Sequence, residues 1–181
     1  MSDDKNNQAN GKVSLTDIWP QERDYMARPD RFRYLRRAIT KDTSCVFCTA
    51  RDKGPSLETL CLYKDESVLV ILNKYPYNTG HIMILPAKHC GDIDDLTDEE
   101  YTSISLMLRK SIKIVRKVYN CQGLNVGLNH GKVAGAGIPD HLHWHVIPRW
   151  NGDTNFFPII AETKVLPETV EQTYARYQGE F

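Results

Sequence analysis

The chain has 181 residues, of which 41% are hydrophobic and 25% are charged, and its 23 basic and 23 acidic side chains cancel. This length and composition predict one globular domain with a sizeable core. The balanced charge argues against a nucleic-acid or membrane-surface protein, although a neutral protein can still form a locally positive pocket for a small polyanion.

The overall composition of the sequence also predicts the cellular compartment of the protein. No stretch approaches the roughly 20 apolar residues that span a bilayer, and the polar start MSDDKNNQANGK does not resemble a signal peptide. Five cysteines, an odd number, suit metal binding or free thiols better than a disulfide framework. We therefore expect a cytoplasmic protein.

In chain order, residues 1–13 are predicted to be a disordered tail and residues 14–44 an aromatic and basic extension. The core begins at Cys45. The stretch ETLCLYKDESVLVILNKYPYNTGHIMILPAKH predicts strand, turn, strand, loop and strand, because Asp-Glu-Ser and Asn-Thr-Gly break its apolar runs.

A long helix is predicted next. Thr97 and Glu100 form a capping box, and apolar residues then recur at helical spacing until Asn120 and Gly123 end the pattern. GLNVGLN (Gly123–Asn129) alternates like a strand, a glycine-rich loop follows, and DHLHWHVIPRW predicts another strand. A final helix is expected after Pro167. This order indicates an α+β domain with a mainly antiparallel sheet packed against one long and one shorter helix.

Three of the six histidines stand on alternate residues: His141, His143 and His145. On a strand they share one face, with Leu142, Trp144 and Val146 on the core-facing side. A metal site, a catalytic row and a chance arrangement on a buried strand compete as explanations. The row would be about 13 Å long at ~3.3 Å per residue, so we expect the histidines to have different roles.

Two further motifs carry chemistry. The thiolates of Cys45-x-x-Cys48 can bind one zinc ion, whose further ligands could be His89 and His141; two inert buried thiols are the alternative. Gly135, Ala136 and Gly137 precede the histidines, and their amides could form an anion-binding nest, although most such loops are merely loops.

Together these motifs resemble the histidine triad (HIT) superfamily, whose signature His-φ-His-φ-His-φ-φ is matched from His141 to Ile147. The resemblance runs from Cys45 to about Phe157 and implies a HIT-like domain over residues 45–157, followed by a partly helical extension over 158–181. The run NVGLN…AGAG…HLHWHVIPRWNGDTNF is most similar to the branch of bacterial diadenosine tetraphosphate phosphorylases.

The resemblance implies roles for single residues. His143 corresponds to the nucleophile that forms a nucleotidyl-histidine intermediate, and His145 to the residue that hydrogen-bonds the phosphate. Asn73 corresponds to the polar position that holds the ribose, eight residues before His81. Asn129 corresponds to a polar residue near the phosphate, and the loop Gly135, Ala136, Gly137 to the phosphate loop.

The resemblance also implies a structural zinc ion on Cys45, Cys48, His89 and His141, with His141 in both the triad and the metal site. It implies a homodimer as well. Ile138 departs from the pattern, since several relatives carry Ser or Thr there as a donor to the leaving group. His130 has no assigned role; we expect an exposed loop histidine.

The expected activity is cleavage of dinucleoside polyphosphates at the α-phosphate, with inorganic phosphate as the favoured acceptor and water as the alternative. A phosphoramidate hydrolase, a nucleotide-binding module with little catalysis and a zinc hydrolase built on the three histidines are the competing functions.

Overall fold

The computed structural model describes residues 44–153 and 166–181 of the chain. The expected tail (1–13) and nearly all of the expected extension (14–44) lie outside the described residues. The expected boundary between the domain and the C-terminal extension, after residue 157, also lies outside them. These parts of the predicted domain organisation stay predictions.

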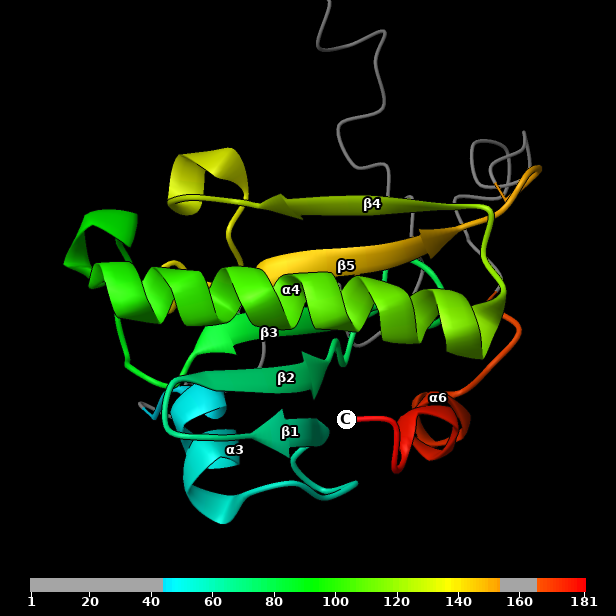
Figure 1. The fold of residues 1–181 in the computed structure, drawn as a ribbon, viewed down its shortest axis with the longest axis horizontal. Coiled ribbons are helices and arrows are strands. Elements are labelled where there is room, and N and C mark those ends of the chain that lie inside the picture. Colours follow the sequence, from blue (N-terminus) through cyan, green and yellow to red (C-terminus); the bar gives the residue numbers. More distant parts are fainter. Residues whose placement is uncertain (1–43, 154–165) are drawn as a thin grey trace, which may run out of the picture.

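One antiparallel sheet of five strands forms the centre of the fold (Figure 1), with the strand order β1-β2-β3-β5-β4. The strands are β1 (Cys61–Lys64), β2 (Val68–Leu72), β3 (Ile82–Pro86), β4 (Gly123–Leu128) and β5 (Trp144–Arg149). The predicted α+β class with a mainly antiparallel sheet is confirmed.

The long helix α4 (Asp98–Tyr119) crosses one face of the sheet (Figure 1). It begins and ends as predicted, because Thr97 and Glu100 form the capping box and Asn120 takes the left-handed conformation with φ 44°. No helix among the described residues has the length and apolar character to cross a membrane.

Two shorter helices of eight residues each flank the sheet, α3 (Val46–Lys53) and α6 (Val170–Tyr177). Helix α6 confirms the predicted final helix and begins with a capping box between Thr169 and Gln172. Helix α3 was not predicted, because eight residues with four polar side chains carry little apolar periodicity.

The core lies on both faces of the sheet, since every residue of β2 and β3 is buried. One cluster packs beneath α4 and α6 and includes Ile84, Ile104 and Val146. The other packs beneath α3 and includes Phe47 and Leu85. The sheet is therefore the middle layer of the domain, with helices on either side.

The histidine segment differs from its prediction in one respect. Strand β5 begins only at Trp144, so His141 and His143 precede it and His145 alone lies within it. The amide of His141 donates to the Ile138 carbonyl (3.4 Å) and that of Leu142 to the Cys90 carbonyl (2.8 Å). Both acceptors lie in loops, so loop hydrogen bonds hold this segment in place of strand pairing. All three histidines are buried. Phe47 of α3 packs against His141 and His143, whereas Tyr77 and His81 pack against His145.

Candidate functional site

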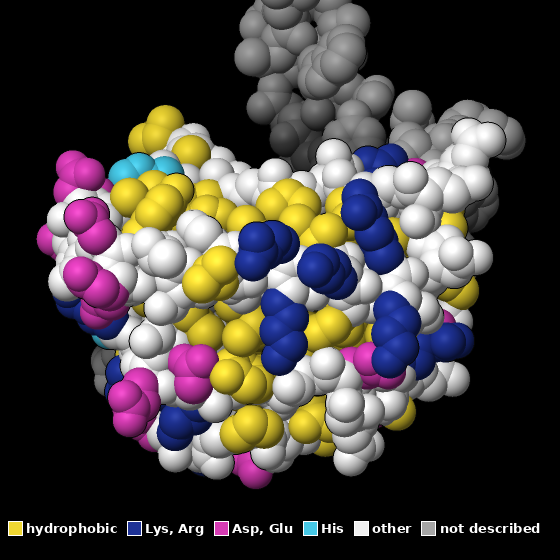
Figure 2. Space-filling model, in the orientation of Figure 1, with side chains coloured by type: hydrophobic (Ala, Val, Ile, Leu, Met, Phe, Trp, Pro, Cys, Tyr) yellow, Lys and Arg dark blue, Asp and Glu magenta, His cyan; other side chains and the backbone are white. Residues whose placement is uncertain are grey.

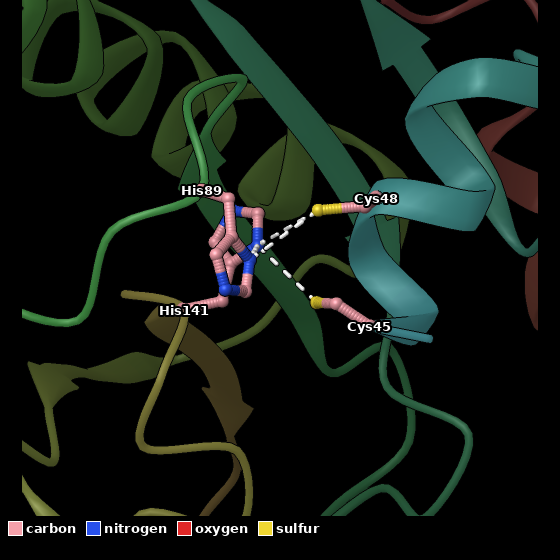
Figure 3. A group of neighbouring side chains, drawn as sticks. All are labelled: Cys45, Cys48, His89 and His141. Carbon is pink, nitrogen blue, oxygen red and sulfur yellow. Dashed lines mark hydrogen bonds between the residues drawn. The ribbon is translucent and has the colours of Figure 1, made fainter. Parts of the chain in front are cut away.

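The four residues predicted to hold zinc come together from three separate segments (Figure 3). Cys45 caps α3 and Cys48 lies in its first turn, whereas His89 follows β3 and His141 precedes β5. Their ligand atoms all lie within 4.8 Å of one another. The C-x-x-C spacing pairs only Cys45 with Cys48, and the fold brings His89 and His141 to them, as the family resemblance implied.

The distances fit one tetrahedral ion. A zinc ion with Zn–S of about 2.3 Å and Zn–N of about 2.05 Å separates sulfur from nitrogen by about 3.6 Å and nitrogen from nitrogen by about 3.3 Å. Here Cys45 Sγ and Cys48 Sγ lie 3.4 and 3.8 Å from His141 Nδ1. His89 Nδ1 lies 3.3 Å from Cys48 Sγ and 3.3 Å from His141 Nδ1. The donor set and its spacing therefore suit zinc.

The protonation of His141 also suits a ligand. Its Nε2–H donates to the Pro86 carbonyl at 2.9 Å, so Nδ1 carries the lone pair and faces the cysteines. Burial lowers the pKa of His141 to about 4, which keeps the imidazole neutral. With all four ligands supplied by the protein, such a site is closed and structural.

His143 is held as a neutral imidazole with its lone pair on Nε2. Its Nδ1–H donates to the carbonyl of His141 at 2.8 Å, which leaves the lone pair on Nε2. Burial lowers the pKa of His143, so the ring is uncharged near neutral pH. Phe47, between the two cysteines, packs its ring 5.4 Å from that of His141 and 5.3 Å from that of His143. The Cys/His cluster and the central histidine therefore share one aromatic neighbour.

His145 belongs to a chain of hydrogen bonds that fixes its tautomer. The amide of Tyr77 donates to His81 Nδ1 (3.1 Å), so His81 carries its hydrogen on Nε2. That Nε2–H donates to His145 Nδ1 at 2.9 Å, in a fully buried contact. A neutral His145 must then carry its own hydrogen on Nε2 and is a donor there. The triad thus contains one Nε2 acceptor, on His143, and one Nε2 donor, on His145.

Asn73 lies in the same loop as His81. Its amide donates to the His81 carbonyl at 3.1 Å, and its Oδ1 accepts from the Tyr75 amide at 2.9 Å. It lines a small cavity together with Thr79, His81 and the start of the C-terminal helix. The loop therefore places Asn73 beside the histidine that contacts the triad, whereas its predicted ribose contact stays a prediction.

The glycine loop follows β4, where η2 (Lys132–Ala134) makes a tight turn. Gly135 takes φ +93°, and a Cβ there would lie 4.0 Å from Asn129 Nδ2, so these two predicted residues are neighbours. The amides of Gly135 and Ala136 donate to the carbonyls of residues 132 and 131, respectively. The hydrogen bonds of these two amides therefore lie within the turn. The phosphate contacts predicted for the loop from Gly135 to Gly137 stay a prediction.

His130 is an exposed loop histidine, as expected, with its Nε2 3.5 Å from Asp92 Oδ1. The residues whose roles sequence reasoning missed are His81, Tyr77 and Phe47. The eight-residue step from Asn73 to His81 marked His81 as part of a family pattern, but the role of the ring depends on a partner 64 residues away. Phe47 gave no signal except its place within C-x-x-C.

An antiparallel sheet with a long helix across it and a buried His-x-His-x-His segment defines the histidine triad class of proteins. The chain belongs to the HIT family: the HIT domain model matches residues 55–152.

Similar proteins agree with this membership. The chain is 36% identical to the AP-4-A phosphorylase of Mycobacterium tuberculosis, over 96% of this chain and 94% of that protein. A histidine triad nucleotide-binding protein of Sulfolobus tokodaii has a similar fold, with TM-score 0.60, 25% identity and coverage of 75% of this chain and 91% of that chain. A zinc-bound histidine triad family protein of Mycobacterium smegmatis gives TM-score 0.58 and 27% identity, covering 76% of this chain and 95% of that chain.

Proposed function

We propose that this protein is a nucleotidyltransferase that cleaves dinucleoside polyphosphates of the diadenosine tetraphosphate type at the α-phosphate, by phosphorolysis. The observation that carries the proposal is the hydrogen bond from His143 Nδ1 to the His141 carbonyl, which leaves the Nε2 lone pair for attack on phosphorus. The similarity to the AP-4-A phosphorylase supports the substrate class.

The reaction proceeds in two displacements. First, His143 Nε2 attacks the α-phosphorus, the bond to the bridging oxygen breaks, and ATP leaves diadenosine tetraphosphate. Adenylate then remains on the histidine through a phosphorus–nitrogen bond. In the second displacement an oxygen of inorganic phosphate attacks the same phosphorus, the phosphorus–nitrogen bond breaks, and ADP forms. The lone pair returns to His143.

Charge on the transferred phosphoryl group requires fixed donors. His145, whose hydrogen lies on Nε2, donates to a phosphoryl oxygen, and the Asn129 side chain supplies a second polar contact. Asn73 holds the ribose, and the loop of Gly135, Ala136 and Gly137 borders the phosphates. Donors that are oriented before substrate binds need no reorganisation in the transition state.

Zinc has a structural role in this proposal. Cys45, Cys48, His89 and His141 hold it, and it joins α3 to the segment before β5. His141 bound to zinc presents its carbonyl to His143 Nδ1, so the metal site orients the nucleophile through the backbone.

Product analysis tests the function. With diadenosine tetraphosphate and phosphate we expect ADP and ATP; AMP and ATP formed equally well without phosphate would instead establish hydrolysis. His143→Ala should lower turnover by about four orders of magnitude or more. His130→Ala, which changes an exposed histidine, is the matched control and should keep wild-type rates. Turnover by a folded His143→Ala variant at the wild-type rate would refute the mechanism.

We also propose a homodimer formed by the face that carries α4 and the edge strand β4. Tyr101 and Leu106 of α4 and Val126 of β4 are exposed, and Figure 2 shows apolar side chains between and above the Lys and Arg side chains on this face. An edge strand has unpaired backbone groups that a second copy can pair, and an exposed apolar patch favours such contact.

A further inference from the structure

The C-terminal helix α6 lies beyond the residues that the HIT domain model matches, yet it reaches the loop before His81. Tyr177, in its last turn, is 1% exposed, and its hydroxyl donates to the carbonyl of Gly80 at 2.7 Å. Burial raises the pKa of Tyr177 well above its usual range, so the hydroxyl stays protonated. The helix therefore contributes a permanent donor to this loop.

The peptide between Gly80 and His81 is held at both ends. Its oxygen accepts from Tyr177, and its N–H donates to the Asn78 carbonyl at 3.3 Å. Gly80 takes φ +78°, and a Cβ there would lie 2.7 Å from the ring of Tyr119. Tyr119 in turn packs its ring 5.5 Å from that of Tyr177. The aromatic pair and the hydroxyl thus fix the backbone immediately before His81.

The position of His81 matters because its ring makes the 2.9 Å contact with His145. A hydrogen bond of this kind weakens steeply when its length or angle changes. A rotation of the Gly80–His81 peptide moves the His81 ring and therefore the His145 ring. The structure gives a continuous route from α6 through two buried hydrogen bonds to the third triad histidine.

We propose that Tyr177 is a positioning residue: its hydroxyl fixes the Gly80–His81 peptide and thereby sets the orientation of His81 and His145. Its effect on turnover rests on the proposed function, whereas its effect on the two imidazoles does not. On this proposal the C-terminal helix is part of the active-site structure and not merely an appendage to the domain.

The chain offers a matched pair of variants on one helix. Tyr177→Phe removes the hydroxyl that donates to Gly80, and Tyr174→Phe removes one that donates to the Cys61 carbonyl at 3.3 Å. Each change deletes a single oxygen bonded to a backbone carbonyl. Cys61 lies in β1, at the opposite edge of the sheet from β4. Unlike Gly80, it is not followed by a histidine that contacts the triad.

The first measurement uses the wild-type protein. Long-range 1H–15N spectra of its imidazoles should show both His81 and His145 as Nε2–H tautomers. The same spectra of Tyr177→Phe should show shifted nitrogen resonances for both rings, whereas Tyr174→Phe should leave them in place. A wild-type His81 in the Nδ1–H form would overturn the proposal without any variant, as would unchanged His81 and His145 resonances in folded Tyr177→Phe.

Kinetics give the second readout. We expect Tyr177→Phe to lower kcat roughly tenfold with KM changed less than about twofold, and Tyr174→Phe to stay within about twofold of wild type. Equal losses in both variants would mean that α6 only supports the fold, which contradicts the proposal. If wild type did not cleave diadenosine tetraphosphate, the proposed function would fail, and the imidazole spectra would still decide the role of Tyr177.

Discussion

Replacing His89 is the sharpest test of the metal site, because His89 is the exposed member of the cluster. The His141 side chain is fully buried and its Nε2 bonds the Pro86 carbonyl, so truncating it would mix metal loss with packing loss. Truncating His89 removes one metal ligand and little buried surface. We therefore predict that His89→Ala lowers stability only to the extent that it weakens zinc binding.

The magnitude follows from binding linkage. Free zinc at about 100 times its dissociation constant stabilises the native state by about 2.7 kcal/mol. For a chain of this size 1 kcal/mol changes Tm by about 2–4 °C, so His89→Ala should lower the Tm of the zinc-loaded protein by about 5–11 °C. His130→Ala is the control, since its 3.5 Å contact with Asp92 joins two half-exposed side chains and such pairs contribute about 0–1 kcal/mol.

The assay is a thermal melt of the wild type and both variants after zinc loading, with and without a chelator, together with zinc content by elemental analysis. Chelation should lower the Tm of wild type and His130→Ala but leave His89→Ala nearly unchanged. The reasoning is refuted if His89→Ala keeps one zinc ion per chain and melts with the wild type.

Two further variants test packing and assembly. Ser111→Ala should raise the free energy of unfolding by about 1 kcal/mol in chemical denaturation. Ser111 Oγ is buried in α4 with no hydrogen-bond partner among the described residues, and Ala favours the helical conformation. A loss of stability would mean that the hydroxyl makes a stabilising hydrogen bond. Leu106→Glu should convert the proposed dimer to a monomer in sedimentation velocity, whereas Leu57→Glu, at another exposed leucine, should not; two identical profiles would exclude the α4 face as the interface.

Local patterns in the sequence predicted much of the fold. Capping residues and apolar periodicity set the limits of α4, since a helix end depends on side chains within one turn of it. Apolar runs, alternation and turn residues located the strands. The limits of β5 were less predictable, because the amides of His141 and Leu142 bond to loop carbonyls that no local pattern indicates.

By itself the sequence determined which chemical groups are available: three alternating histidines, a C-x-x-C motif and a glycine loop. Only the tertiary structure decided how these groups are protonated and held. His81 reaches His145 across 64 residues, and Tyr177 reaches Gly80 across 97. The tautomer of a histidine is set by whichever donor or acceptor faces it, and here these partners come from segments that meet only when the sheet and α6 pack together.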